Sequence, residues 1–412
     1  MGLGEAWRPL AERPFRLLWL GRVSSQVGDA MVPLALSFAV LSVDRSGAAL
    51  GAVLGSLMIT RVVFTLAGGV IADRLSRRTI MLGCDLTRGG VHAFTAAMLL
   101  THHMTILLFV VTEAIFGTAS AFFNPAADGL IAQSVTQENL RPANALLGMS
   151  RSTVNIFGPS LSGVLVALAG SGYVFAIDAA SFALSAFFLA RLHVDAPVRA
   201  GATFVSELKL GFREVATRDW VRAPLIGFGI TNFALAAFLV LGPIIYLSHF
   251  HDARVAWGIT STCGSLLALV GGIISVRFKP RHPLHATFVL SILVGAPLAA
   301  LAGPLPVPIL AAGWGAATCA IAVTNIWWET ALQQRIPEHV YSRVRSYDLL
   351  ASFVFMPIGM FAFGPIGDGV GYEWTLLGAA ALIVVTNLAV AFMPGVRTLE
   401  QYEPATAAPA TA

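Results

Sequence analysis

The chain has 412 residues, of which 56% are hydrophobic and 12% are charged, and its net charge is +4. A soluble domain carries about 25% charged residues, so this chain has too few charges to cover a water-facing surface of its size, and lipid is its expected solvent. The small positive excess does not predict a nucleic-acid partner. The three cysteines lie far apart in apolar runs and predict neither a disulfide framework nor a metal site.

Twelve apolar runs are long enough to cross a bilayer as helices, because a hydrocarbon core of about 30 Å needs about 20 apolar residues. The first six lie near residues 16–42, 49–73, 79–101, 105–131, 143–169 and 173–191. The other six lie near residues 223–249, 255–276, 284–302, 306–332, 345–369 and 372–393. The sequence therefore predicts an all-α membrane protein with twelve transmembrane helices.

These runs divide the chain into two pseudo-symmetric six-helix bundles, at residues 1–192 and 223–394. A polar linker at 193–222 joins them, and a disordered tail is expected at 395–412. Residues 207–215 of the linker alternate apolar and charged side chains, which predicts a short amphipathic helix along the inner membrane face. The alternative is a plain solvated connector.

Lysine and arginine residues indicate the orientation of the predicted helices. If the N-terminus is cytoplasmic, twenty of the 26 lie in or beside inner segments, whereas only Arg45 and Arg254 lie in outer loops. Positive residues favour the cytoplasmic side of a membrane protein. We therefore expect both termini in the cytoplasm.

Two segments recur at a distance of about half the chain. Residues 68–78 (GGVIADRLSRR) are echoed by 271–281 (GGIISVRFKPR), and each copy ends an apolar run with a short basic loop. A second echo joins 133–141 to 333–343. A membrane protein built from two similar halves is most simply a transporter with parallel repeats.

The first basic loop reads Gly69-x-x-x-Asp73-Arg74-x-x-Arg77-Arg78. It resembles the signature loop of the major facilitator superfamily, whose members are secondary transporters. The resemblance covers nearly the whole chain, from residue 15 to 394, and does not identify a substrate.

Three further stretches resemble one branch of that superfamily, the drug and siderophore exporters that include macrolide-efflux and enterobactin-export permeases. They are Asp85-Leu86-Thr87-Arg88, Ala143-Asn144-Ala145-Leu146 followed by Gly158-Pro159-x-x-x-Gly163, and residues 333–346. The resemblance to this branch implies export.

The basic loop is expected to control opening on the inner side. The resemblance places Asp73 near the N-terminus of the eleventh helix, beginning near Arg343, whose partial positive charge would stabilise the carboxylate. The three arginines of the loop can pair with carboxylates at inner helix ends, and the candidate partners are Asp85 and Asp128. The alternative is that these arginines only mark the cytoplasmic side. In the second copy Val276 replaces the acid, which predicts a weaker contact.

The fifth helix contains Gly158, Pro159 and Gly163, which remove one backbone donor and two side chains within a short stretch. This composition predicts a kinked and closely packed segment. The resemblance associates the motif with antiporters and places it against the other half. The alternative is ordinary packing of small residues.

Asp29, Arg61 and Glu113 lie inside predicted helices, where a charge costs at least about 2.5–3.5 kcal/mol. We expect them to share one water-filled cavity and to couple transport to protons. Burial favours the neutral carboxyl group and a nearby arginine favours the carboxylate, and this competition suits proton binding and release. The alternatives are a structural hydrogen bond for Asp29, contact with outer water for Glu113 and a fixed counter-ion role for Arg61. Asp178 is expected to be an interfacial cap.

The substrate cavity is expected between the halves, with Arg151 and Asn155 one helical turn apart on its N-terminal side. The C-terminal half offers apolar, aromatic and amide side chains at a similar depth: Asn232, Phe233, Phe238, Asn325, Trp327 and Trp328. The alternative for the aromatic residues is packing or contact with lipid.

Together these features predict a proton-coupled exporter of a hydrophobic or amphipathic small molecule, such as a drug, antibiotic or siderophore. The sequence contains no nucleotide-binding glycine-rich loop, so an ion gradient is the expected energy source, with no cofactor, metal or enzymatic reaction. Uptake or lipid flipping by the same fold, an intramembrane enzyme and a non-transporting receptor are the alternatives. The expected partners are the substrate, protons and the bilayer. The ratio of 24 Arg to 2 Lys suggests a bacterial plasma membrane, and we expect a monomer.

Overall fold

The computed structural model describes residues 7–193, 213, 215–303 and 305–400, and within these ranges every regular element is a helix. The side chains of residues 66–74, 338, 339, 342, 343, 346 and 349 are outside this description. Residues 207–212 and 214 of the predicted linker helix and the end of the tail, 401–412, also fall outside it.

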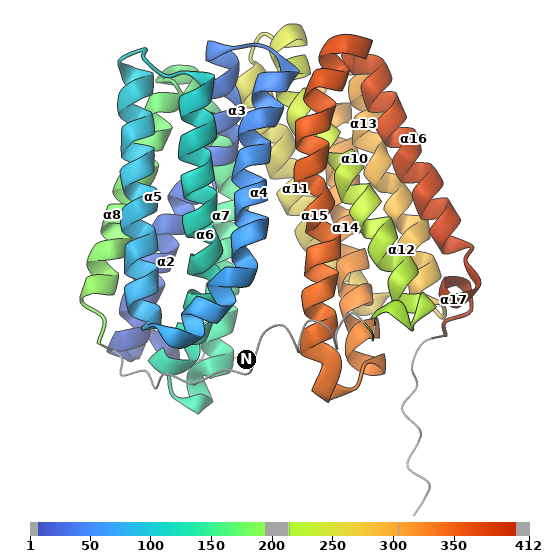
Figure 1. Ribbon diagram of the computed structural model, residues 1–412, viewed down its shortest axis with the longest axis horizontal. Helices are drawn as coiled ribbons and strands as arrows, with labels where there is room; N and C mark the ends of the chain where they lie inside the picture. The colour runs from blue at the N-terminus through green and yellow to red at the C-terminus, as the bar shows by residue number, and fades with distance from the viewer. Residues whose placement is uncertain (1–6, 194–212, 214, 304, 401–412) are drawn as a thin grey trace, which may run out of the picture.

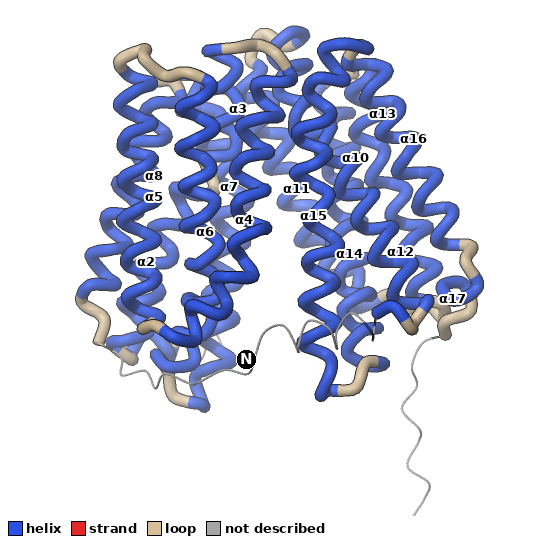
Figure 2. Tube along the Cα trace, viewed as in Figure 1, coloured by secondary structure: helices blue, strands red, loops and turns tan. Residues whose placement is uncertain are grey.

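The helices pack as two groups that stand side by side (Figure 1). The first group contains η1 (Arg8–Ala11), α2 (Arg13–Asp29), α3 (Val32–Val43), α4 (Gly47–Arg74), α5 (Arg77–Leu100), α6 (Ile106–Ser134), η2 (Gln137–Asn139), α7 (Leu140–Leu168) and α8 (Ser171–Ala190). The second contains α10 (Asp219–His249), α11 (Ala253–Arg277), α12 (Pro283–Ser291), η3 (Ile292–Gly295), α13 (Ala296–Ala302), α14 (Val307–Arg335), α15 (Glu338–Val370), α16 (Tyr372–Ala391) and α17 (Pro394–Arg397). The long helices run between two ends where the loops gather (Figure 2).

Ten helical stretches of the described chain are long and apolar enough to cross a membrane. Two further helices, α5 and α7, have comparable lengths of 24 and 29 residues and stand beside the others (Figure 1). They carry more polar side chains, including the ionisable residues of α5 described below. Each of the twelve predicted apolar runs falls on helical chain, and two of them contain an interruption. The number of membrane crossings stays a prediction.

Two of the predicted runs are interrupted, and a proline lies next to each interruption. The first run breaks at residues 30–31, between α2 and α3, and Pro33 follows. Proline has no N–H, so Pro33 cannot donate to the carbonyl of Asp29 four residues earlier. In the same way Pro297 follows the 3₁₀ turn η3, which separates α12 from α13.

Some helix ends differ from the prediction. Helix α15 begins at Glu338 rather than near Arg343, and α10 begins at Asp219 rather than near 223, because helices continue as polar turns past their apolar runs. Pro394–Arg397 form α17 within the stretch predicted as a disordered tail. Its Val396 is fully buried in the apolar cluster of the second group, which explains this order.

The two groups contact each other through α4 against α15 and through α7 against α11. At the first contact Asp368 of α15 accepts hydrogen bonds from the N–H groups of Gly47 and Ala48, at 2.9 and 2.8 Å. These N–H groups belong to the first turn of α4, so Asp368 caps that helix from the other group. The backbones approach closely here, since a Cβ at Gly51 would lie 2.2 Å from the carbonyl oxygen of Met360.

At the second contact Ser160 and Thr262 share a hydrogen bond of 2.7 Å, and Thr262 donates to the carbonyl of Ile156 at 2.9 Å. Hydrogen bonds between described residues of the two groups occur only at these two contacts. Both lie toward the end of the molecule where α4 and α11 begin (Figure 1). The groups approach at this end and diverge toward the other (Figure 1).

Candidate functional site

Six ionisable side chains from four helices gather inside the first group. They are Asp29 on α2, Asp85, Arg88 and His92 on α5, Glu113 on α6 and Asp178 on α8. We call this set the ionisable cluster. Five of its members are at most 4% exposed, whereas the side chain of Asp29 is 35% exposed. The three α5 members recur at positions i, i+3 and i+7, which places them on one helix face.

The ionisable cluster has two parts, and Arg88 is the cation of the first part. It donates to Asp85 on its own helix, and its Nη1 lies 3.7 Å from Oδ2 of Asp29. Asp85 also accepts a hydrogen bond from Ser185 at 2.6 Å. The Arg88 guanidinium stands 4.1 and 4.4 Å from the ring centroids of Phe123 and Phe182, positions that attract a cation. Both polar and aromatic contacts therefore hold Arg88 in place.

His92 is the centre of the second part. Its Nδ1 is hydrogen-bonded to Asp178, and its Nε2 lies 3.7 Å from Oε1 of Glu113. The imidazole stacks on Phe116 at 4.1 Å and meets the edge of Phe175 at 5.0 Å. All three ionisable residues are completely buried. Both carboxylate oxygens of Glu113 and Nε2 of His92 have no hydrogen-bond partner.

The backbone of α2 brings the two parts together. A Cβ at Gly28 would lie 2.0 Å from Oδ1 of Asp178 and 2.5 Å from the Ser181 hydroxyl, so only glycine allows this approach. The next residue, Asp29, interacts electrostatically with Arg88, Asp178 and His92 of the cluster. Asp29 is therefore the exposed edge of a charge network that continues into the buried interior.

The helix break after Asp29 contacts the α7 motif. Ser162 of α7 donates to the carbonyl of Met31 at 2.6 Å, and a Cβ at Gly158 would lie 2.6 Å from the Ala30 methyl group. On the opposite side, a Cβ at Gly163 would lie 2.6 Å from the carbonyl oxygen of Arg254 on α11. The motif residues thus stand between the break in the first group and a helix of the second group.

Of the three residues expected to share one water-filled cavity, Glu113 is completely buried. Asp29 and Arg61 interact electrostatically, but Glu113 faces His92 instead. Glu113 is fully buried, so its expected alternative, contact with outer water, is wrong. The interfacial role expected for Asp178 is also wrong, because Asp178 is buried within α8 and bonded to His92.

Sequence reasoning missed His92 as a site residue. The available signal was its spacing, because it follows Asp85 and Arg88 by seven and four residues on one helix. A histidine alone in an apolar run carries no such information. Only its alignment with the other two polar residues pointed to a shared face.

The predicted basic loop is only partly described: Gly69, Asp73 and Arg74 belong to the last turns of α4, and the side chains of Asp73 and Arg74 lie outside the description. Arg77 donates to the carbonyl of Gly129 at 2.7 Å. Arg78 donates to the carbonyls of Leu189 and Ala190 at the end of α8, at 2.9 and 2.5 Å. These contacts connect the start of α5 to the neighbouring helix ends.

The acids proposed as partners of the loop arginines have other described partners. Asp85 lies about two turns inside α5 and pairs with Arg88, so its expected role at the inner helix end is wrong. Asp128 lies 3.7 Å from Arg22 of α2.

Three arginines from three helices stand near one another. Arg151 of α7 is close enough to both Arg22 of α2 and Arg61 of α4 to repel them electrostatically. Arg61 and Arg151 are exposed, as is Asn155 one turn further along α7. Of these three arginines, Arg61 also interacts electrostatically with Asp29.

Two aromatic residues predicted for the substrate cavity are buried in helix packing. Phe238 is 3% exposed and stacks between Trp257 and Trp314, with centroid distances of 5.2 and 4.3 Å. Trp328 is also 3% exposed and donates its indole N–H to Asp348 at 2.9 Å. The packing alternative describes both, because large rings fill the interior of the second group.

The other four residues of the second group that were predicted for the cavity have different environments from one another. Phe233 lies 5.0 Å from Phe363, and Asn232 donates to its own helix at 3.1 Å. Asn325 is exposed. Trp327 is 8% exposed and its indole N–H has no partner.

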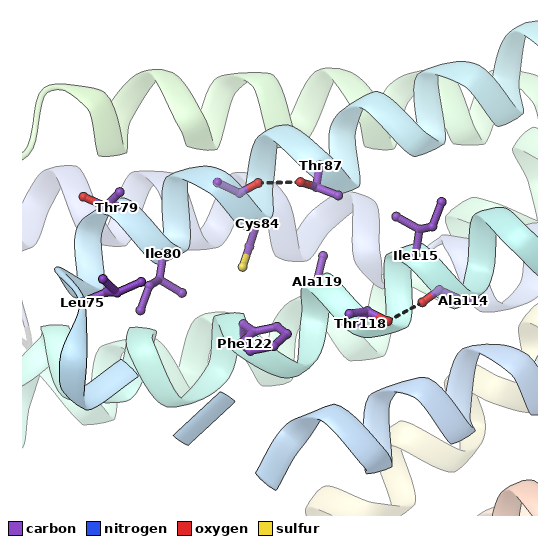
Figure 3. Close-up of a pocket in the computed structure, with 11 residues that line it drawn as sticks. Leu75, Thr79, Ile80, Cys84, Thr87, Ala114, Ile115, Thr118, Ala119 and Phe122 are labelled. Carbon is purple, nitrogen blue, oxygen red and sulfur yellow. Dashed lines mark hydrogen bonds between the residues drawn. The ribbon is translucent and has the colours of Figure 1, made fainter. Parts of the chain in front are cut away.

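A groove of about 530 Å³ lies between α5 and α6 (Figure 3). Two of its three threonines, Thr87 and Thr118, donate to carbonyls of their own helices at 2.9 and 2.8 Å, so these two hydroxyls are already satisfied (Figure 3). No lining residue is charged, and no member of the ionisable cluster lines the groove. The groove is therefore an apolar surface separate from the charge network.

Comparison with known proteins agrees with this architecture. A model of the transmembrane secretion effector family matches residues 4–410. The multidrug efflux pump Tap of Mycobacterium tuberculosis is 25% identical, with 94% of this chain and 95% of the relative covered. Macrolide efflux protein A of Streptococcus pyogenes is 22% identical, with 90% and 94% covered.

Solved transporters share the fold. The nucleoside transporter NupG matches with a TM-score of 0.71 at 17% identity, covering 92% of this chain and 98% of that one. A bacterial homologue of the iron transporter ferroportin, in an inward-facing state, matches with a TM-score of 0.72 at 16% identity, covering 92% and 99%.

Proposed function

Because the chain belongs to the transmembrane secretion effector family of the major facilitator superfamily, we propose that it is a proton-coupled exporter. Its substrate would be a hydrophobic or amphipathic small molecule such as a drug, antibiotic or siderophore. The efflux activity named for its relatives supports export. The proposed topology has twelve transmembrane helices and cytoplasmic termini in a bacterial plasma membrane, as the distribution of Lys and Arg favours.

The observation that carries the proposal is the ionisable cluster with Asp29 at its exposed edge. Buried charges are expensive in a membrane protein and mark ion pathways and proton relays. Asp29 is the cluster member that meets the space outside the helix packing. It is therefore our candidate for exchanging protons during transport.

Two physical connections would carry a change at Asp29 to the contacts between the halves. Protonation of Asp29 removes its attraction for Arg61 on α4, and α4 packs against α15. The helix break beside Asp29 contacts Ser162 on α7, and α7 packs against α11. Proton binding can thus bias both interfaces at once.

With the proposed topology, the contacts of Asp368 and Thr262 lie toward the outer side. The arrangement then corresponds to a state closed to the outside. A proton would enter from outside in the alternative state and leave toward the cytoplasm in this one, where substrate binds. The rocking of two halves about a central site is the usual form of alternating access in such folds.

The arginine group formed by Arg22, Arg61 and Arg151 supports an amphipathic substrate. Guanidinium groups are donors without acceptors, so a substrate with carbonyl, carboxylate or phosphate oxygens would find partners there. Apolar parts of the same molecule would contact the surrounding helices. This placement favours substrates that carry at least one acceptor group beside a hydrophobic body.

A vesicle assay tests the proposal. Purified protein is reconstituted with an imposed pH gradient, and export of a radiolabelled macrolide and of the dye ethidium is measured. Asp29→Asn should reduce gradient-driven export to the rate of protein-free vesicles, because the asparagine amide cannot release a proton. Asp252→Asn is the matched control, since Asp252 is 80% exposed in a loop. Full gradient-driven export by Asp29→Asn would remove this residue from its proposed role.

Uptake and lipid flipping by the same fold remain the alternatives. Accumulation of the macrolide in cells with and without the protein distinguishes the direction. Export predicts lower accumulation when the protein is present, and uptake predicts the reverse.

A further inference from the structure

The ionisable cluster contains more negative than positive groups. Four carboxyl groups, those of Asp29, Asp85, Glu113 and Asp178, face the single guanidinium of Arg88 and the imidazole of His92. With every carboxyl group ionised and the histidine neutral, the cluster would carry three uncompensated negative charges. A buried site does not tolerate this without binding protons.

The guanidinium of Arg88 is already used by two of the four acids. It bonds to Asp85 and lies 3.7 Å from Asp29, and Arg61 on α4 is a further cation that interacts with Asp29. Asp178 also accepts a hydrogen bond from Ser181 at 3.3 Å, but His92 is the basic partner that faces both Asp178 and Glu113. The titratable groups around the imidazole are these two acids from α8 and α6 and Asp29 from α2. Arg88, Asp85 and Cys84 lie further along α5.

Glu113 is the least compensated member. Its two carboxylate oxygens have no hydrogen-bond donor, and Nε2 of His92 is 3.7 Å away and also unpartnered. Hydrogen bonds between such atoms are about 2.7–3.2 Å long, so a small side-chain movement would close the gap. The rings of Phe116, Phe175 and Phe182 surround the imidazole of His92.

We propose that His92, Asp178 and Glu113 form a proton-binding site that is occupied at neutral pH and is distinct from Asp29. The proton resides either on Glu113, as a neutral carboxylic acid, or on His92, as an imidazolium between two carboxylates. The described residues contain no group of three metal-ligating side chains placed around one ion, and the proton is the ligand that the chemistry of this site fits. The proposal deepens the proposed function and rests on it for its role in transport.

Asp29 gives this site a connection to solvent. The backbone of Gly28 presses on Asp178, and Asp29 is partly exposed. Proton transfer along the site balances as follows: the O–H bond of Glu113 breaks as an N–H bond forms at Nε2 of His92, and the Nδ1–H bond breaks as an O–H bond forms on Asp178. His92 ends neutral with its proton on the other nitrogen, and Asp178 holds a proton beside Asp29.

Spectroscopy of the full-length protein in detergent at neutral pH tests the site without transport. Infrared difference spectra report the carbonyl stretch of a protonated buried carboxylic acid, and ¹⁵N NMR reports imidazolium. One signal is expected: either a carboxylic acid band that Glu113→Gln removes, or an imidazolium resonance that His92→Gln removes. Finding neither signal in the folded wild-type protein would overturn the proposal.

Controls assign the signal and separate it from the proposed function. Glu138→Gln and His251→Gln change exposed residues and should leave the signal unchanged. Asp178→Asn provides a second variant should Glu113→Gln or His92→Gln fail to fold, and it should shift or abolish the same signal. Asp29→Asn should keep it, so a protein that binds the proton but shows no gradient-driven export would contradict the proposed function alone.

Discussion

Arg88 shows how one side chain can satisfy several constraints inside a helix bundle. It pairs with Asp85, approaches Asp29 and stands over two aromatic rings. Arginine suits this position because its planar, permanently charged group can bond in several directions and stack at once. A lysine would provide the charge but not the geometry.

Removing Arg88 should strongly destabilise the protein, because Asp85 would be left buried and unpaired. Loss of one partner of a buried ion pair costs about 3–5 kcal/mol. We expect Arg88→Ala to lower the melting temperature in detergent markedly, and Arg88→Ala combined with Asp85→Ala to lower it less than the two single changes added together.

Arg222→Ala is the matched control for that measurement. Arg222 pairs with Asp219 at 2.7 Å, but both side chains are more than half exposed, and such pairs contribute about 0–1 kcal/mol. Equal losses for Arg88→Ala and Arg222→Ala would mean that the buried pair does not hold the bundle together.

At the scale of elements, α5 and α7 differ from the other long helices. Helix α5 carries the ionisable face, and α7 carries the proline and glycine motif between the break at residues 30–31 and α11. Both are less apolar than the ten candidate spans because their polar groups serve contacts within the protein. Helix α5, whose membrane signal is weak, therefore carries three of the six members of the ionisable cluster.

The contact between α7 and α11 should respond to side chains added at Gly163. A Cβ there would lie 2.6 Å from the backbone carbonyl of Arg254, so Gly163→Leu should force the helices apart. Spin labels at Leu168 and Ile259, in a background without the native cysteines, should report a longer and broader distance distribution. Gly148→Leu on the same helix is the control, since nothing lies within 4 Å of a Cβ at Gly148; an unchanged distribution for Gly163→Leu would contradict this packing.

At the scale of the whole molecule, the two groups of helices contact each other toward one end. Asp368 is central there, because it accepts two backbone N–H groups of the opposite group and a hydrogen bond from Tyr372 at 2.8 Å. Its removal would affect the balance between conformations rather than the packing within either group.

Asp368→Ala should shift the population away from the arrangement described here. Loss of a helix cap costs about 0.5–2 kcal/mol, which corresponds to a shift of about 2- to 30-fold in the equilibrium between states. Distances between spin labels on α4 and α15 near this end should show a larger separated population. Glu373→Ala, at the neighbouring start of α16, should leave the distribution as in the wild type.

The sequence by itself determined where along the chain the long helices lie. Helix formation in lipid depends on the local length of apolar chain, so each apolar run could be read without knowledge of its neighbours. The interrupted helices at Pro33 and Pro297 are local effects of the same kind. The repeat of two halves and the resemblance to transporters also came from contiguous residues.

Only the tertiary structure decided which charges meet. His92 and Asp178 are 86 positions apart, and Asp29 reaches Arg88 from another helix, so their pairing depends on how four helices rotate and pack. The same packing placed Phe238 and Trp328 in the interior rather than at a cavity. Composition limits which residues are buried. The interaction partners of a buried charge depend on how each helix is rotated about its axis, and no local sequence pattern determines that rotation.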